Sequence, residues 1–158
     1  MKPKTVLFVC SGNICRSPMA EGFLRKMLRE RLGEASKGIQ VLSAGLNAFE
    51  GYATGEAFQV MRDEGVDLSN FRSKQLTLEM VEKADLILTM QRSHKFHVLA
   101  LDPKARDKTF TLKEFSGETE KPDIADPYGG GIRAYKACAE EIKGSLNKVL
   151  EKILGFLG

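Results

Sequence analysis

A thiol and a guanidinium stand six positions apart near the start of the chain, in VLFVCSGNICRSP at residues 6–18, as Cys10 and Arg16. An apolar run precedes Cys10 and a helical pattern follows Arg16, so the loop between them joins a strand to a helix. The N–H groups of such a loop and of the helix start form an anion site, in which a cysteine ionises readily. The planar guanidinium of an arginine fits two phosphate oxygens. This pattern predicts a phosphate site in which a thiolate attacks phosphorus.

The rest of the loop and the leaving group add further expectations. Ser17 can donate its hydroxyl to the Cys10 thiolate, and Gly12 and Asn13 can adopt positive φ, which turns their N–H groups inward. Attack on phosphorus expels an alcohol or phenol oxygen, which needs a proton as it leaves. Asp126, in the stretch ADPYGG, is a candidate acid, but spacing alone does not select it from 21 acidic residues.

Strand and helix patterns alternate along the chain. Apolar runs predict strands at residues 4–10, 39–45 and 84–90, and a weaker one at 108–112. Helical patterns cover residues 18–32, 54–64, 78–83, 93–101 and the chain from about 132 onward. Ser17 is the expected N-cap of the first helix and Gly33 its end. The alternation predicts an α/β sandwich around a parallel sheet, with a long loop at 113–131.

Composition limits the class of protein. The 158 residues suit a single domain spanning residues 1–158, and the net charge of +3 is spread along the chain, which argues against a general nucleic-acid surface. No apolar run reaches the length of about 20 residues that spans a bilayer, and the first residues lack a signal-peptide core, so we expect a cytoplasmic protein without membrane contact. Three cysteines with no extracellular spacing indicate reduced thiols.

Residues 9–18, VCSGNICRSP, match the signature V-C-x-G-N-x-C-R-S-P of the low molecular weight protein tyrosine phosphatases. The likeness continues through SAG at 43–45, DLILTM at 85–90 and DPY at 126–128, so the chain resembles this family over essentially its whole length. The resemblance implies a four-stranded parallel sheet of order 2-1-3-4 with helices on both faces, a Rossmann-like three-layer sandwich. It also implies that the protein uses no metal or cofactor.

The resemblance assigns roles to three residues. Cys10 would be the nucleophile that forms a phosphocysteine, and Arg16 would bind the phosphoryl oxygens and stabilise the transition state. Asp126 would act first as the acid and then as the base that activates water. The substrate would be a tyrosine-phosphorylated protein, and small aryl phosphates would react in the same way.

The resemblance also implies a supporting set. The phosphate-binding loop would consist of Ser11, Gly12, Asn13, Ile14, Cys15, Arg16 and Ser17. Asn13 and Ser17 would orient this loop, with Ser43 bonded to Asn13 from beneath. Phe49 and Tyr128 would form aromatic walls around a phenyl ring and could mediate weak self-association, which leaves monomer or weak dimer open. The chain reads GYAT at 51–54 where many members have G-x-P-x, so the conformation of the loop after Phe49 stays open.

Several residues have two interpretations. Cys15 is either a small buried residue or the partner in a reversible disulfide that protects Cys10 from over-oxidation. His94 and His97 could form a metal pair, but no further ligands stand nearby, so a solvated helix face is the favoured interpretation. Cys138 lies on the apolar stripe of the last helix and is expected in the core.

Three alternative functions remain. Phosphoarginine phosphatases carry a threonine before the second loop cysteine, where this chain has the bulkier Ile14, which suits an aryl phosphate better. Thiol-dependent arsenate reductases need additional cysteines, and residues 80–90 contain none. A non-catalytic phosphoprotein-binding or redox-sensing module usually loses the nucleophile, the arginine or the acid, and this chain keeps all three.

Overall fold

The computed structural model describes residues 3–48 and 51–158, and within these ranges the strands form one parallel sheet of four in the order β2-β1-β3-β4. The strands are β1 (Lys4–Cys10), β2 (Ile39–Gly45), β3 (Leu86–Thr89) and β4 (Thr109–Thr111). Each lies within its predicted range, and the strand order that the family resemblance implied is confirmed. Val6 of the central strand β1 pairs with Val41 on one side and with Leu86 on the other.

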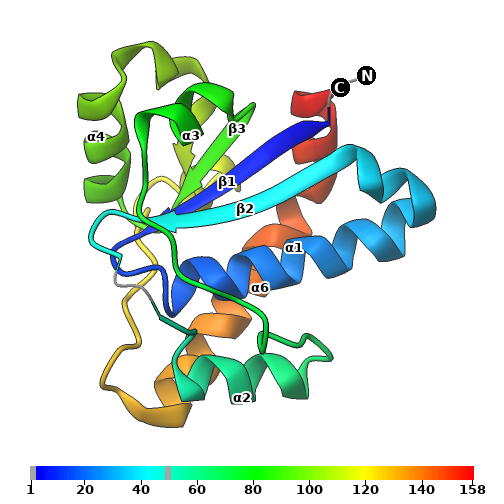
Figure 1. Ribbon diagram of the computed structural model, residues 1–158, viewed down its shortest axis with the longest axis vertical. Helices are drawn as coiled ribbons and strands as arrows, with labels where there is room; N and C mark the ends of the chain where they lie inside the picture. Colours follow the sequence, from blue (N-terminus) through cyan, green and yellow to red (C-terminus); the bar gives the residue numbers. More distant parts are fainter. Residues whose placement is uncertain (1–2, 49–50) are drawn as a thin grey trace.

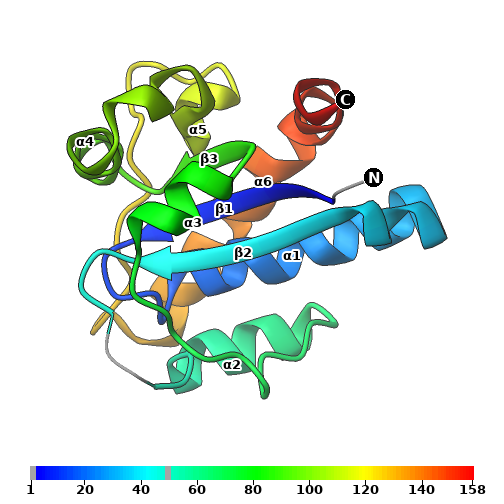
Figure 2. The ribbon, with the colours of Figure 1, turned by 45° about the horizontal axis from the view of Figure 1, so that its top comes forward.

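Helices cover both faces of this sheet (Figures 1 and 2). On one face lie α1 (Arg16–Leu32) and α6 (Gly131–Leu157), with α2 (Gly55–Asp63) packed against them. The other face carries α3 (Leu78–Lys83) and α4 (Arg92–Leu101). Short helical segments complete the chain: η1 (Gly33–Gly38), η2 (Pro103–Lys108) and α5 (Leu112–Phe115). The expected three-layer sandwich is therefore confirmed.

The side chains of β1 alternate between two apolar cores, because successive strand residues point to opposite faces. Phe8 faces the larger core, which lies under α1 and α6, and Val9 faces the smaller one, under α3 and α4. The predicted stripe of α6 is buried: Cys138, Ile142, Leu146, Val149, Ile153 and Leu157. Burial raises the pKa of the Cys138 thiol to about 12, so this cysteine is a protonated core residue, as predicted.

The start of α1 differs from the prediction. The helix begins at Arg16 rather than Pro18, and its cap residue is Cys15, which makes no side-chain capping bond within the described chain. The N-cap prediction for Ser17 is wrong because its hydroxyl is engaged in the loop below the thiol. The helix does end where predicted, with Gly33 in the left-handed region at φ 58°.

The predicted long loop at 113–131 is shorter at both ends. Its first residues belong to α5, which begins with a capping box between Thr111 and Glu114, and its last residue begins α6. In the part of the chain that the structure describes, no helix is long and apolar enough to cross a membrane.

Candidate active site

The loop after β1 lies at a topological switch point. The chain pairs β1 with β2 on one side and with β3 on the other, and such a point at the carboxyl edge of a parallel sheet is where ligands bind. Backbone hydrogen bonds from another segment hold this loop. Leu46 N–H donates to the Cys10 carbonyl at 3.1 Å, and Thr54 N–H donates to the Ile14 carbonyl at 2.9 Å. The loop is therefore fixed at both ends by the segment that follows β2.

Cys10 ends β1 with its sulfur facing two hydrogen-bonding groups. The Ser17 hydroxyl lies 2.9 Å from Cys10 Sγ, and the backbone N–H of Asn13 donates to the same sulfur at 3.3 Å. Both contacts place a hydrogen-bonding group directly against the sulfur, and the Asn13 N–H can only donate to it. The expected contact between Ser17 and Cys10 is present.

Asn13 is the structural centre of the loop. Its backbone has φ 57°, a conformation that asparagine tolerates better than most residues, whereas Gly12 stays outside the left-handed region. The prediction of positive φ is thus right for Asn13 and wrong for Gly12. Asn13 Nδ2 donates to Ser17 Oγ at 2.8 Å and to Ser43 Oγ at 2.9 Å, and its Oδ1 accepts from the backbone N–H of Lys74 at 2.8 Å. The bond to Ser43 that the resemblance implied is present.

Arg16 is buried, with 1% of its surface exposed, and its guanidinium is anchored from behind. Nη1 donates to Gln91 Oε1 and to the Ile124 carbonyl, both at 2.6 Å. Nη2 lies 3.8 Å from Asp126 Oδ2, on the side of the cavity. Sequence reasoning missed both anchors, although Gln91 follows the end of β3 at the same edge of the sheet, which is a usable signal.

One cavity of about 290 Å³ collects the predicted groups. It is lined by Cys10, Gly12, Ile14, Cys15, Arg16, Asp126 and Tyr128. The Asp126 carboxylate is half exposed and accepts from the backbone N–H of Tyr128 at 3.1 Å, which orients it beside Arg16. Tyr128 is largely exposed at the cavity. Phe49, the other expected aromatic wall, lies outside the described residues.

Cys15 has different surroundings from Cys10. Its sulfur lies 3.1 Å from the hydroxyl of the buried Tyr135 and 3.8 Å from Thr54 Oγ1. Burial raises the pKa of the Cys15 thiol, and it also raises the pKa of the Tyr135 phenol. Cys15 is therefore held as a thiol in the lining of the cavity. Tyr135 was not predicted from the sequence, since it is one of many side chains on the inner stripe of α6.

The prediction for His94 is wrong. This residue is 2% exposed rather than solvated, because α4 turns it toward the loop after β1. Its Nε2 lies 3.0 Å from Ser11 Oγ, and its Nδ1 has no hydrogen-bond partner among the described residues. Burial, helped by the nearby Arg16 charge, lowers the pKa of His94 to about 4. His94 is therefore a neutral support of the loop at neutral pH, whereas His97 is exposed as predicted.

The described residues contain no group of three His, Cys, Asp or Glu side chains that could hold a metal ion. What the cavity does hold is a thiol with donors directed at its sulfur, a guanidinium anchored from behind and a carboxylate beside it. On a parallel sheet with this strand order, that arrangement defines a cysteine-dependent phosphatase.

Comparison with known proteins specifies the family. Residues 5–154 match the family model described as "Low molecular weight phosphotyrosine protein phosphatase", and the chain belongs to this family. It is 40% identical over 152 residues to a protein-arginine-phosphatase of Geobacillus stearothermophilus, with 96% of this chain and 97% of that protein covered. It is also 40% identical over 151 residues to a probable low molecular weight protein-tyrosine-phosphatase, EpsP, of Ralstonia nicotianae, covering 95% of this chain and 96% of that one.

A solved structure agrees with this membership. The crystal structure of a low molecular weight protein tyrosine phosphatase from T. tengcongensis matches with a TM-score of 0.85 and 44% sequence identity. The match covers 94% of this chain and 99% of that one.

Proposed function

We propose that this phosphatase hydrolyses phosphotyrosine in proteins, and small aryl phosphates, through a phosphocysteine intermediate. The observation that carries the proposal is the lining of the cavity, where Ile14 and Tyr128 add apolar and aromatic surface to the phosphate-binding groups. A phenyl ring is favoured against such surface, because offset and edge contacts between rings add to the gain from burial.

The first step would transfer the phosphoryl group to the enzyme. The phosphate oxygens would accept hydrogen bonds from the loop N–H groups and from Arg16, whose guanidinium is held in place by its two anchors. Cys10 Sγ would attack phosphorus and form the S–P bond as the P–O bond to the phenol breaks. Asp126, half exposed beside Arg16, would donate its proton to the phenolic oxygen.

The second step would release phosphate. The Asp126 carboxylate would take a proton from a water molecule, and the water oxygen would attack phosphorus as the S–P bond breaks. The Cys10 sulfur would leave as a thiolate, stabilised by the N–H of Asn13 and the hydroxyl of Ser17. Inorganic phosphate and the free enzyme would result.

Phosphoarginine is the second candidate substrate, because relatives that are 40% and 39% identical to this chain are named protein-arginine-phosphatases. The residue expected to discriminate between the two substrates is Ile14. Its side chain lines the cavity and carries no hydroxyl, whereas phosphoarginine phosphatases have a threonine at this position. Rates of hydrolysis should be compared on phosphotyrosine and phosphoarginine peptides of the same sequence, for the natural chain and for Ile14→Thr.

We expect the natural chain to have the higher kcat/KM on phosphotyrosine and Ile14→Thr to shift the ratio toward phosphoarginine. Faster phosphoarginine hydrolysis by the natural chain would overturn the assignment.

We infer further that residues 1–158 act as a single domain, as a monomer or weak dimer in the cytoplasm, on a tyrosine-phosphorylated partner. Trapping with Asp126→Ala, which would bind substrates but hydrolyse them slowly, would identify that partner. We also propose that Cys15 can form a reversible disulfide with Cys10 when peroxide has oxidised Cys10 to a sulfenic acid, with loss of water.

A further inference from the structure

The hydrogen bonds beneath Cys10 continue beyond Ser43 to a charged pair that the mechanism does not use. Ser43 Oγ donates to Glu21 Oε1 at 2.8 Å, and Glu21 Oε2 lies 3.2 Å from Arg25 Nη1. Glu21 is buried, with 6% of its side chain exposed, whereas half of the Arg25 side chain is exposed. The chain of contacts therefore runs from the nucleophile to a cation at the surface.

We propose that Glu21, held by Arg25, is a positioning residue for the Cys10 nucleophile. This inference rests on the proposed function only where it is tested by measuring phosphatase activity. The contacts themselves are a property of the folded chain, so the reactivity of the Cys10 sulfur tests it without a substrate.

The direction of each hydrogen bond supports the proposal. Asn13 Oδ1 accepts from the backbone N–H of Lys74, so its Nδ2 must be the group that faces Ser17 and Ser43 and donates to both. Ser43 accepts from Asn13 and directs its own proton to Glu21, which as a carboxylate can only accept. Ser17 likewise accepts from Asn13, which leaves its own proton free for donation to Cys10 Sγ, 2.9 Å away. A carboxylate at the far end thus fixes Ser43, and Ser43 fixes the amide that orients Ser17.

Arg25 favours the charged form of that carboxylate. Burial is the largest influence on the pKa of Glu21 and raises it. Arg25, the hydrogen bond from Ser43 and Lys74 each lower this pKa, and Arg25 has the largest effect of the three. A protonated Glu21 could donate to Ser43, and the fixed direction of the chain would be lost. Removal of the Arg25 charge should therefore weaken the hydrogen bonds that position Cys10, although Arg25 does not contact Cys10 itself.

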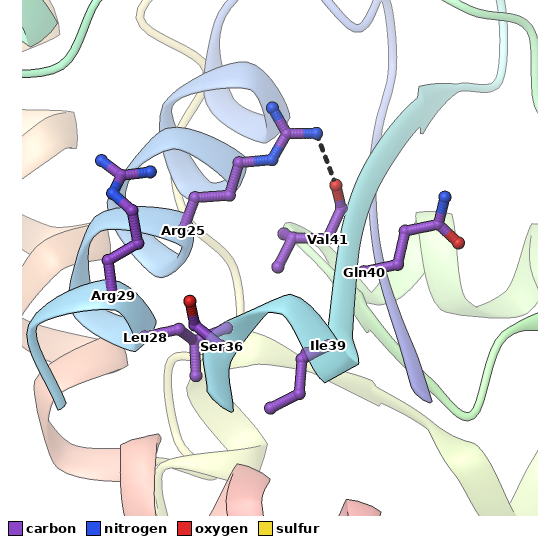
Figure 3. Close-up of a pocket in the computed structure, with 7 residues that line it drawn as sticks. All are labelled: Arg25, Leu28, Arg29, Ser36, Ile39, Gln40 and Val41. Carbon is purple, nitrogen blue, oxygen red and sulfur yellow. Dashed lines mark hydrogen bonds between the residues drawn. The ribbon is translucent and has the colours of Figure 1, made fainter. Parts of the chain in front are cut away.

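The surroundings of Arg25 make this test practical. Figure 3 shows its side chain reaching from α1 to β2, where Nη2 donates to the Val41 carbonyl at 2.8 Å. The side chain borders a surface hollow of about 300 Å³, to which Arg29 also contributes from one turn farther along α1. Arg25→Met keeps most of the hydrocarbon chain and removes the charge, and Arg29→Met makes the same change beside it and serves as the matched control.

The experiment measures two quantities across about pH 5 to 8. The first is the rate at which iodoacetamide alkylates Cys10, with Cys15→Ser and Cys138→Ser present in every variant so that Cys10 is the cysteine that reacts. The second is kcat/KM on para-nitrophenyl phosphate. In Arg25→Met we expect the alkylation rate and kcat/KM both to fall about tenfold at about pH 5, and the acid side of each pH profile to move to higher pH. Arg25→Lys should recover most of the loss, and Arg29→Met should match the parent chain.

Glu21→Gln tests whether Arg25 acts through Glu21. It should lower both rates as Arg25→Met does, and adding Arg25→Met to Glu21→Gln should produce little further loss. The proposal is overturned if folded Arg25→Met and Glu21→Gln alkylate at the parent rate at every pH, or if their effects simply multiply. An inactive parent chain with normal alkylation would refute the proposed function and leave this inference to be decided by the alkylation rates.

Discussion

The burial of His94 predicts a specific loss of stability in mild acid. Its pKa of about 4 in the folded chain lies below the ordinary value of 6.5, so the unfolded chain binds a proton more readily between these values. Stability contributed by the neutral imidazole is therefore complete above about pH 6.5 and is lost as the pH falls toward about 4. At a slope of about 1.4 kcal/mol per pH unit, the decrease from about pH 7 to about pH 5 amounts to roughly 2 kcal/mol.

Urea unfolding followed by circular dichroism measures this loss. The natural chain, His94→Gln and His97→Gln would each be unfolded at about pH 7 and about pH 5, and the free energy of unfolding extrapolated to water. We expect the natural chain to lose roughly 2 kcal/mol more than His94→Gln over this interval. His97 is exposed on the same helix, so His97→Gln should follow the natural chain.

Only the difference between the two pH values is compared, so any direct effect of the substitution on packing cancels. An equal loss in the natural chain and His94→Gln would refute the reasoning, because it would show that His94 is not the group whose protonation opposes folding.

Three further predictions concern the phosphate-binding loop and the reaction. A Cβ on Gly45 would lie 2.8 Å from the Ser11 carbonyl oxygen, so Gly45→Ala should lower kcat/KM on para-nitrophenyl phosphate at least about tenfold by displacing the loop, whereas Gly38→Ala, which meets nothing within 4 Å, should not. Asp126→Ala should slow hydrolysis of phenyl phosphates by about 10²-fold or more and of esters with very acidic leaving groups far less; equal slowing would place the acid elsewhere. Cys10→Ser should abolish turnover while vanadate binding, measured by calorimetry, persists; appreciable turnover would reveal another nucleophile.

Much of the fold was predictable because its determinants are local. The strands β1, β2 and β3 are short, largely apolar runs, and the last helix carries an apolar stripe with helical periodicity, which fixes the face that is buried. The position of Cys10 and Arg16 at a strand-to-helix junction is likewise a property of adjacent residues. The helix start was misplaced because Ser17, a good N-cap by residue type, finds stronger partners in Cys10 and Asn13.

The contacts that complete the site join residues far apart in the chain. Gln91 and the Ile124 carbonyl anchor Arg16 from 75 and 108 positions away, and no periodicity in the sequence relates such positions. His94 was misjudged for the same reason: its spacing from His97 describes a helix but does not say which of the two faces the loop.

The sequence by itself therefore determined the alternation of strands and helices, the phosphate-binding loop and the side chains able to react there, because these follow from neighbouring residues. The tertiary structure alone decided how Arg16 is held, which histidine is buried and where the hydrogen bonds beneath the thiol end. Those outcomes depend on how β2, β3, α1 and α4 pack around β1, and packing sets the distances between groups that are distant along the chain.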